Sequence, residues 1–329
     1  GRAFAGQHAA RHLRVVVDPM GGAAQGYLAD LLRELGVEVH EIHADETTVQ
    51  VHKESAKRTK RKNQVSWMWL YAASPLDPES PDIRIFEYCP GRSGENAEKF
   101  LEGFHGILVH DQFHGYNRLA VEHAACWAHM RREFVKALSA DPRQGGEDVL
   151  RDPENRKGKA WEAICKIGAI AAIEEKLNDL PPEERKEARL RQEKPLVEDF
   201  FAWLESIRTR LLPKFQTAKA VNYALNAKER LSRYLSDGRI PMTNNAAESA
   251  IRPFTIGRKN WLFSDSPKGA EASAAIYSII ETSKANGLDP EKYLSYVLTE
   301  MRGKSFVGNQ EMLECWMPWS KVVQDNCKA

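Results

Sequence analysis

The sequence predicts an α/β fold, in which a mixed β-sheet has flanking helices and is interrupted by an all-α insertion subdomain. Short runs rich in β-branched and aromatic residues, separated by short loops, recur up to residue 110 and predict the sheet. The stretch 152–235 instead has a helical pattern, broken near Leu180-Pro181-Pro182 and Leu212-Pro213. A chain of 329 residues can hold about two or three domains.

The first part of the chain predicts a β-α-β unit. Strand 13–17 leads through a Gly-rich turn into helix 27–35, and Gly36 caps this helix before strand 37–42. Residues 13–42 resemble the start of the second domain of phosphohexomutases, the phosphoglucomutase and phosphomannomutase family. Short α/β units of this pattern recur widely, so the resemblance alone implies no activity.

A second series of elements predicts the mixed sheet. Three strands joined by short loops precede a helix, a fourth strand and another helix. In chain order we expect strands 42–51, 66–73 and 83–88, helix 96–104, strand 106–110 and helix 128–139, with a basic loop at 57–62 between the first two strands.

Two helices follow the all-α stretch. Asn244-Asn245 introduce and cap a short helix that contains Glu248, and we expect Pro253 to end it. An amphipathic helix over 268–285 is closed by Gly287. The predicted division is 1–42 for the β-α-β fragment, 43–138 for the first part of the sheet domain, 139–240 for the helical insertion, and 241–329 for the second part of the sheet domain with the C-terminal helices.

Charge, cysteine content and apolar runs limit the partners and the compartment expected for this chain. The formal net charge is +1, from 47 basic and 46 acidic residues, so any nucleic-acid surface must come from local clustering. The 5 cysteines are odd in number and scattered, which indicates a reducing compartment, and we expect the cytoplasm. The longest apolar run, 163–173, contains Lys166 and is shorter than the roughly 20 residues of a membrane span, so no membrane partner is expected.

Three acidic residues stand out by their position in these elements. Alternate side chains of a strand share a face, so Asp45 lies with Val49, and Asp111 lies with Val109, on core-facing sides. Alanines around Glu248 leave no bulk between its helix and the sheet. Carboxylates there are costly unless a bound divalent cation offsets their desolvation. Taken singly, each residue has a plainer alternative as a turn, cap or solvent-facing acid.

The order of these acids resembles a ribonuclease-H-like nuclease core, with an aspartate on the first strand, another after the fourth strand and a glutamate on a later helix. Two Mg²⁺ or Mn²⁺ ions held roughly 3.5–4 Å apart can activate the attacking oxygen of a phosphodiester reaction and stabilise the leaving oxygen. Hard cations take oxygen ligands, which Asp45, Asp111 and Glu248 supply.

Several motifs, in the right order, resemble the insertion sequence 66 family of bacterial transposases from about residue 43 to the C-terminus. They are Asp-Glu-Thr-Thr-Val-Gln-Val at 45–51, Trp-Met-Trp-Leu-Tyr at 67–71, Arg-Ser-Gly at 92–94, Gly-Tyr-Asn at 115–117, Cys-Trp-Ala-His-Met-Arg-Arg at 126–132, and Arg-Pro-Phe-Thr-Ile-Gly-Arg-Lys-Asn-Trp-Leu-Phe at 252–263. The resemblance implies cutting and joining of DNA at transposon ends, with Asp45, Asp111 and Glu248 as the acidic triad.

The chain departs from the family pattern in three places. The family usually has Asp at the position of Thr243, Arg at the position of Ser249, and Asp-Gly-Tyr where this chain has Asp111-Gln112-Phe113. The family's N-terminal cysteine-rich zinc-binding region also has no counterpart before Asp45. The alternative function is therefore a truncated, inactive transposase remnant that at most binds DNA. A sugar-phosphate mutase is rejected because neither the serine loop nor the Asp-Gly-Asp-Gly-Asp loop of that family is present.

Two further sets of residues are candidates for binding. DNA contact is expected from cations, with an aromatic ring that can stack on an unpaired base. The alternative for these cations is a solvated surface without a ligand. This set comprises Arg131, Arg132, Arg252, Arg258, Lys259 and Trp261. Cys126 and His129 form a Cys-x-x-His pair, which is at most half of a four-ligand zinc site. We favour a packed helix start over zinc for this pair.

The resemblance also implies partners. A transposase pairs two DNA ends, so we expect transposon-end DNA and a homo-oligomer in a synaptic complex, and other proteins encoded by the element can take part. The sequence leaves open which DNA ends are recognised.

Overall fold

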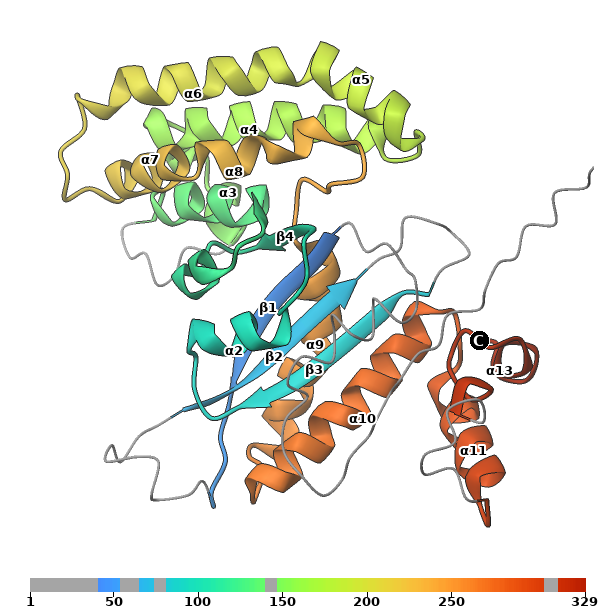
Figure 1. The fold of residues 1–329 in the computed structure, drawn as a ribbon. Coiled ribbons are helices and arrows are strands. Elements are labelled where there is room, and N and C mark those ends of the chain that lie inside the picture. The colour runs from blue at the N-terminus through green and yellow to red at the C-terminus, as the bar shows by residue number, and fades with distance from the viewer. Residues whose placement is uncertain (1–40, 54–64, 74–80, 140–146, 305–312) are drawn as a thin grey trace, which may run out of the picture. The chain divides into compact units, whose positions relative to one another are not determined.

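The structure, a computed structural model, describes residues 41–53, 65–73, 81–139, 147–304 and 313–329 (Figure 1). It forms two compact units, each of which contains strands and helices. Unit 1 comprises Gly1–Gly106, Phe113–Val121 and Ala246–Ala329, and unit 2 comprises Ile107–Gln112 and Glu122–Asn245. Within the described ranges, no helix has the length and apolar character needed to cross a membrane.

Two predicted features lie outside the described residues: the β-α-β unit over 13–42, apart from its last two residues, and the basic loop at 57–62. The four-part division of the chain stays a prediction.

Unit 1 contains an antiparallel sheet of three consecutive strands, close to the predicted positions. They are β1 Glu41–Val49, β2 Ser66–Ala73 and β3 Ile83–Cys89. Asp45 pairs with Leu70 across β1 and β2, and Leu70 pairs with Phe86 across β2 and β3. Cross-strand partners share a face, so these three side chains lie on one side of the sheet.

That side of the sheet is covered by two long helices, which lie behind the strands in Figure 1. They are α9 Asn245–Trp261 and α10 Pro267–Ala285. Leu70 and Phe86 join Ala247, Phe254 and Ala274 from these helices in one apolar cluster. Beyond Gly287, which has the positive φ typical of a helix end, follow α11 Pro290–Met301 and α13 Lys321–Cys327.

The opposite side of the sheet packs against shorter elements, α2 Gly94–Phe100 and the 3-10 helix η1 His114–Arg118. Tyr71 stacks on Phe100 of α2 with ring centroids 4.0 Å apart, and Trp69 packs edge-on against Tyr116 of η1. The alternation of residues 69, 70 and 71 in β2 thus builds two separate cores, one on each face.

The expectation that Pro253 ends the Glu248 helix is wrong, because α9 continues to Trp261. Proline lacks an N–H and so removes one bond to the preceding turn. Ile251 and Phe254 on either side of it are buried in the apolar cluster, and this packing carries the helix past the missing bond.

Unit 2 contains two parallel strands, β4 Ile107–His110 and β5 Glu122–Ala125, which pair directly. Its helices are α3 Trp127–Lys136, α4 Gly158–Leu177, α5 Pro182–Gln192, α6 Lys194–Arg208, α7 Gln216–Asn226 and α8 Lys228–Ser232. Both predicted breaks occur, between α4 and α5 and between α6 and α7. Aromatic and aliphatic side chains of α3, α4, α6 and α7 form one core.

A buried polar network also holds the helices of unit 2 together. Arg189 of α5 is fully buried, donates to both carboxylate oxygens of Glu174 on α4, and donates to the carbonyl of Tyr234 at 2.8 Å. The Tyr234 hydroxyl donates in turn to Glu193 at 2.7 Å. Buried charges need such partners, so this network fixes how α4, α5 and the segment after α8 meet.

Candidate active site

Asp45 lies in the middle of β1 and faces α9. Its cross-strand partner Leu70 is buried in the same apolar cluster as Ala247 and Ile251 of α9. The half-buried carboxylate therefore points to the α9 side of the sheet, and its Oδ1 accepts the Glu46 N–H at 2.9 Å. This is the core-facing side that strand alternation predicts.

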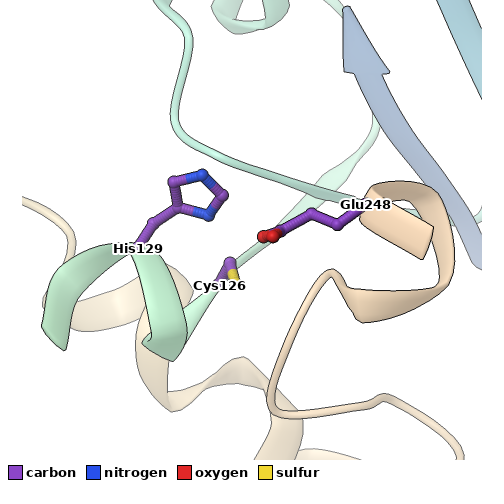
Figure 2. Close-up of side chains that lie close together, drawn as sticks. All are labelled: Cys126, His129 and Glu248. Atoms are coloured by element: carbon purple, nitrogen blue, oxygen red, sulfur yellow. The ribbon is translucent and has the colours of Figure 1, made fainter. Parts of the chain in front are cut away.

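Glu248 lies in the first turn of α9 and is half-buried (Figure 2). Ala247 and Ala250 on either side are buried in the apolar cluster to which Val49 of β1 also belongs. At the other end of α9, Arg258 donates to Thr47 Oγ1 at 2.9 Å and to the Thr48 carbonyl. Asp45 and Glu248 therefore lie on two elements of unit 1, β1 and α9, that contribute to one apolar cluster.

Asp111 directly follows β4 in unit 2 and is half-buried. Its carbonyl accepts the Tyr223 hydroxyl at 3.0 Å. Burial raises the pKa of Tyr223, and the Asp111 carboxylate raises it further, so this hydroxyl keeps its proton and stays a donor. The next residue, Gln112, has a φ of 71°, a conformation that is strained for any residue except glycine.

A histidine pair supports the chain beside Asp111, and sequence reasoning missed it. His110 Nδ1 accepts the Gln112 N–H at 3.0 Å, and His110 Nε2 lies 3.1 Å from His123 Nδ1. Burial lowers the pKa of His110, and His123 and Arg230 lower it further. The ring is therefore neutral near pH 7 and, since Nδ1 accepts, carries its proton on Nε2.

Cys126 and His129 lie at the start of α3 (Figure 2). Their Sγ and ring nitrogen atoms lie within 4.8 Å of each other. Cys126 is fully buried, and its sulfur accepts the Asn244 N–H at 3.1 Å. The pair would supply at most two of the four ligands of a structural zinc site, and its role as a packed helix start stays a prediction.

The predicted DNA-binding residues differ in their surroundings. Arg252 and Lys259 are exposed on α9, and within the described residues neither has an acidic partner. Arg258 instead holds the end of β1, and half-buried Trp261 packs edge-on against Phe254. On α3, Arg132 is exposed and Arg131 half-buried; these two cations stay predicted DNA contacts.

Family comparisons match most of the chain. The family model described as "Transposase IS66 family" matches residues 13–272, and the model described as "IS66 C-terminal element" matches residues 278–319. The first match includes residues 13–42, and no comparison supports their resemblance to phosphohexomutases.

Two curated relatives come from Sinorhizobium fredii (strain NBRC 101917 / NGR234), "Uncharacterized protein y4hP" and "Uncharacterized protein y4qI". Each is 30% identical to this chain, over 298 and 306 residues respectively. The matches cover 88% and 89% of this chain and 52% and 53% of the relatives, so the chain spans about half the length of the curated relatives it matches. No solved structure matches, and the ribonuclease-H-like resemblance stays a prediction.

Proposed function

Because the chain belongs to the IS66 family of transposases, we propose that it cuts DNA at transposon ends and joins the cut ends to a target through Asp45, Asp111 and Glu248. One observation carries the proposal furthest. Asp45 and Glu248 come from positions 203 residues apart in the chain, yet they lie on β1 and α9 of unit 1, whose side chains share one apolar cluster.

Each side chain of this triad has the oxygen donors that a divalent cation takes. All three are carboxylates, the donors that Mg²⁺ and Mn²⁺ prefer, and all three are half-buried, where a cation would offset the cost of desolvation. Two bound ions would stabilise the attacking and leaving oxygens of the phosphodiester. The protein's own part is to hold the acids, with the Tyr223 hydroxyl and the neutral His110 fixing the backbone around Asp111.

Cations on α9 support the DNA part of the proposal. Arg252 and Lys259 are four and eleven residues after Glu248, so they follow it along one side of the helix. Both are exposed, and phosphate contacts from such cations position a DNA backbone. The proposal also includes assembly into a synaptic homo-oligomer and help from other proteins of the element. It places this activity in the cytoplasm.

The test is strand cleavage by the full chain on duplex DNA that carries the ends of its own element, with Mg²⁺ or Mn²⁺. We expect nicking at the ends and a loss of at least about a hundredfold in Asp111→Asn, because two-metal chemistry depends on each ligand. Glu271→Gln, which alters an exposed glutamate of α10, is the matched control and should cut normally.

End-specific DNA binding without cleavage under any metal condition would contradict this proposal. That result would favour the alternative, an inactive remnant that only binds DNA.

A further inference from the structure

A second carboxylate lies next to Asp45 and points the opposite way. Glu46 pairs with Trp69 across β1 and β2, so its side chain lies on the α2 face of the sheet. This side chain is only 1% exposed. A buried carboxylate requires strong partners, and Glu46 has them on both oxygens.

Arg92 and Tyr116 provide these partners. Arg92 donates to Glu46 Oε1 through Nε at 2.8 Å and through Nη2 at 2.5 Å, and the Tyr116 hydroxyl donates to Glu46 Oε2 at 2.6 Å. These are charge-assisted bonds, which are stronger than bonds between neutral groups, and both Arg92 donors converge on the same oxygen, Glu46 Oε1. We call Glu46, Arg92 and Tyr116 the back-face clamp.

Aromatic rings fix both partners of the clamp in place. The Arg92 guanidinium lies 3.8 Å from the centroid of the Phe113 ring and 4.7 Å from that of Trp67. Tyr116 is fully buried and meets Trp69 edge-on. Such contacts add to the ion pair and leave Arg92 little freedom to swing away.

Two glycines, Gly94 and Gly115, lie in close contact where α2 meets η1 beside the clamp. A Cβ on Gly94 would overlap the Gly115 carbonyl, so α2 and η1 approach as closely as they do only with glycine at this position. The motifs at 67–71, 92–94 and 115–117, to which the proposed chemistry gives no role, thus converge on Glu46.

We propose that Glu46 is a positioning residue for Asp45, and that the back-face clamp fixes β1 so that Asp45 presents its carboxylate to a divalent cation on the α9 face. The reason is the alternation of a strand: residues 45 and 46 share one peptide link and point to opposite faces, so anchoring one side chain sets the orientation of the other. Glu46 points to the α2 face, away from the proposed cation, so Glu46 itself is not one of its ligands. The inference rests on the proposed function.

The experiment is a calorimetric Mn²⁺ titration of the full chain and of two matched variants. Tyr116→Phe removes the hydroxyl that donates to Glu46. Tyr293→Phe removes another buried hydroxyl of unit 1, which donates to the Trp316 carbonyl at 2.9 Å in a separate cluster of α11 and α13. The two changes are chemically identical, so they separate positioning of Asp45 from a general loss of stability.

We expect Tyr116→Phe to weaken Mn²⁺ binding by up to about tenfold, the lower end of the effect of disturbing the groups that orient a metal ligand, because Glu46 would then hold β1 and Asp45 less firmly. We expect Tyr293→Phe to bind like the unchanged protein. Glu46→Gln, which also removes the charge that pairs with Arg92, should weaken binding at least as much. Thermal melts of each variant confirm that the chain is folded during the titration.

Equal Mn²⁺ affinity for the unchanged protein, Tyr116→Phe and Glu46→Gln would overturn the inference and leave the proposed function standing. An equal loss in Tyr116→Phe and Tyr293→Phe would also overturn it, because the role of Tyr116 would then be structural only. Absence of both Mn²⁺ binding and DNA cleavage in the unchanged protein would overturn the proposed function, and the inference with it.

Discussion

At the scale of single residues, Gln112 has a backbone conformation that is unfavourable for glutamine. Its φ of 71° lies in the left-handed region, and its side-chain Nε2 is buried with no hydrogen-bond partner among the described residues. The family pattern has glycine at this position, after Asp111. The structure supplies the physical reason, because glycine adopts a positive φ at no steric cost.

Gln112→Gly should therefore stabilise the protein. A non-glycine residue in the left-handed region costs roughly 1–2 kcal/mol, which glycine avoids. Glycine is also more flexible in the unfolded chain, and this lowers the stability by roughly 0.5–1 kcal/mol. With the buried amide also removed, we expect a net gain of about 1 kcal/mol in urea unfolding.

Leu262→Gly is the matched control, since Leu262 also has a positive φ (64°) but is 60% exposed. It should gain less than Gln112→Gly, because no buried polar group is relieved. A Gln112→Gly variant that is less stable than the unchanged protein would show that the glutamine side chain stabilises this turn.

At the scale of elements, strand β3 carries a carboxyl group that titrates abnormally. Burial raises the pKa of Glu87 from 4.5 to about 8, and a hydrogen bond with Cys89 partly opposes the shift. The folded protein thus keeps this group protonated at neutral pH, whereas the unfolded chain ionises it above pH 4.5. The stability that Glu87 contributes is complete below the unfolded pKa and is lost as the pH rises through the folded pKa.

Replacing Glu87 with glutamine, which mimics the protonated acid, should remove this pH dependence. Between pH 5 and pH 8, the unchanged protein should lose on the order of 2 kcal/mol of unfolding free energy relative to Glu87→Gln. Urea unfolding at several pH values measures the difference. Burial also raises the pKa of Glu193, but Glu193 is present in both proteins, so its contribution cancels in the comparison. Parallel pH profiles for the two proteins would refute the assignment.

Among the elements, periodicity predicted the long and strongly patterned ones well. The three strands of unit 1 and both helix breaks of unit 2 occur close to their expected positions, because β-branched runs and prolines act locally. Helix α9 was predicted too short because the sequence shows Pro253 but not the apolar cluster that carries the helix past it. The short strand β5 and the 3-10 helix η1 were missed, since four or five residues carry too little pattern.

At the scale of the whole molecule, the sequence indicated the three acids but not what surrounds them. Strand alternation placed Asp45 on the α9 side of the sheet, and the alanines beside Glu248 are buried in the apolar cluster that α9 shares with the sheet. The back-face clamp and the histidine pair beside Asp111 join residues that are 13 to 70 positions apart. Such contacts depend on the fold as a whole, so no local sequence pattern predicts them.

The most direct test of the central claim is the affinity of the full chain for Mn²⁺, compared by calorimetry with Asp45→Asn, Glu248→Gln and the exposed control Glu271→Gln. We expect binding by the unchanged protein and the control, with a loss of at least about tenfold in each of the other two variants, because both carboxylates are ligands of the proposed cation. Unaltered binding in either Asp45→Asn or Glu248→Gln would contradict the shared metal site.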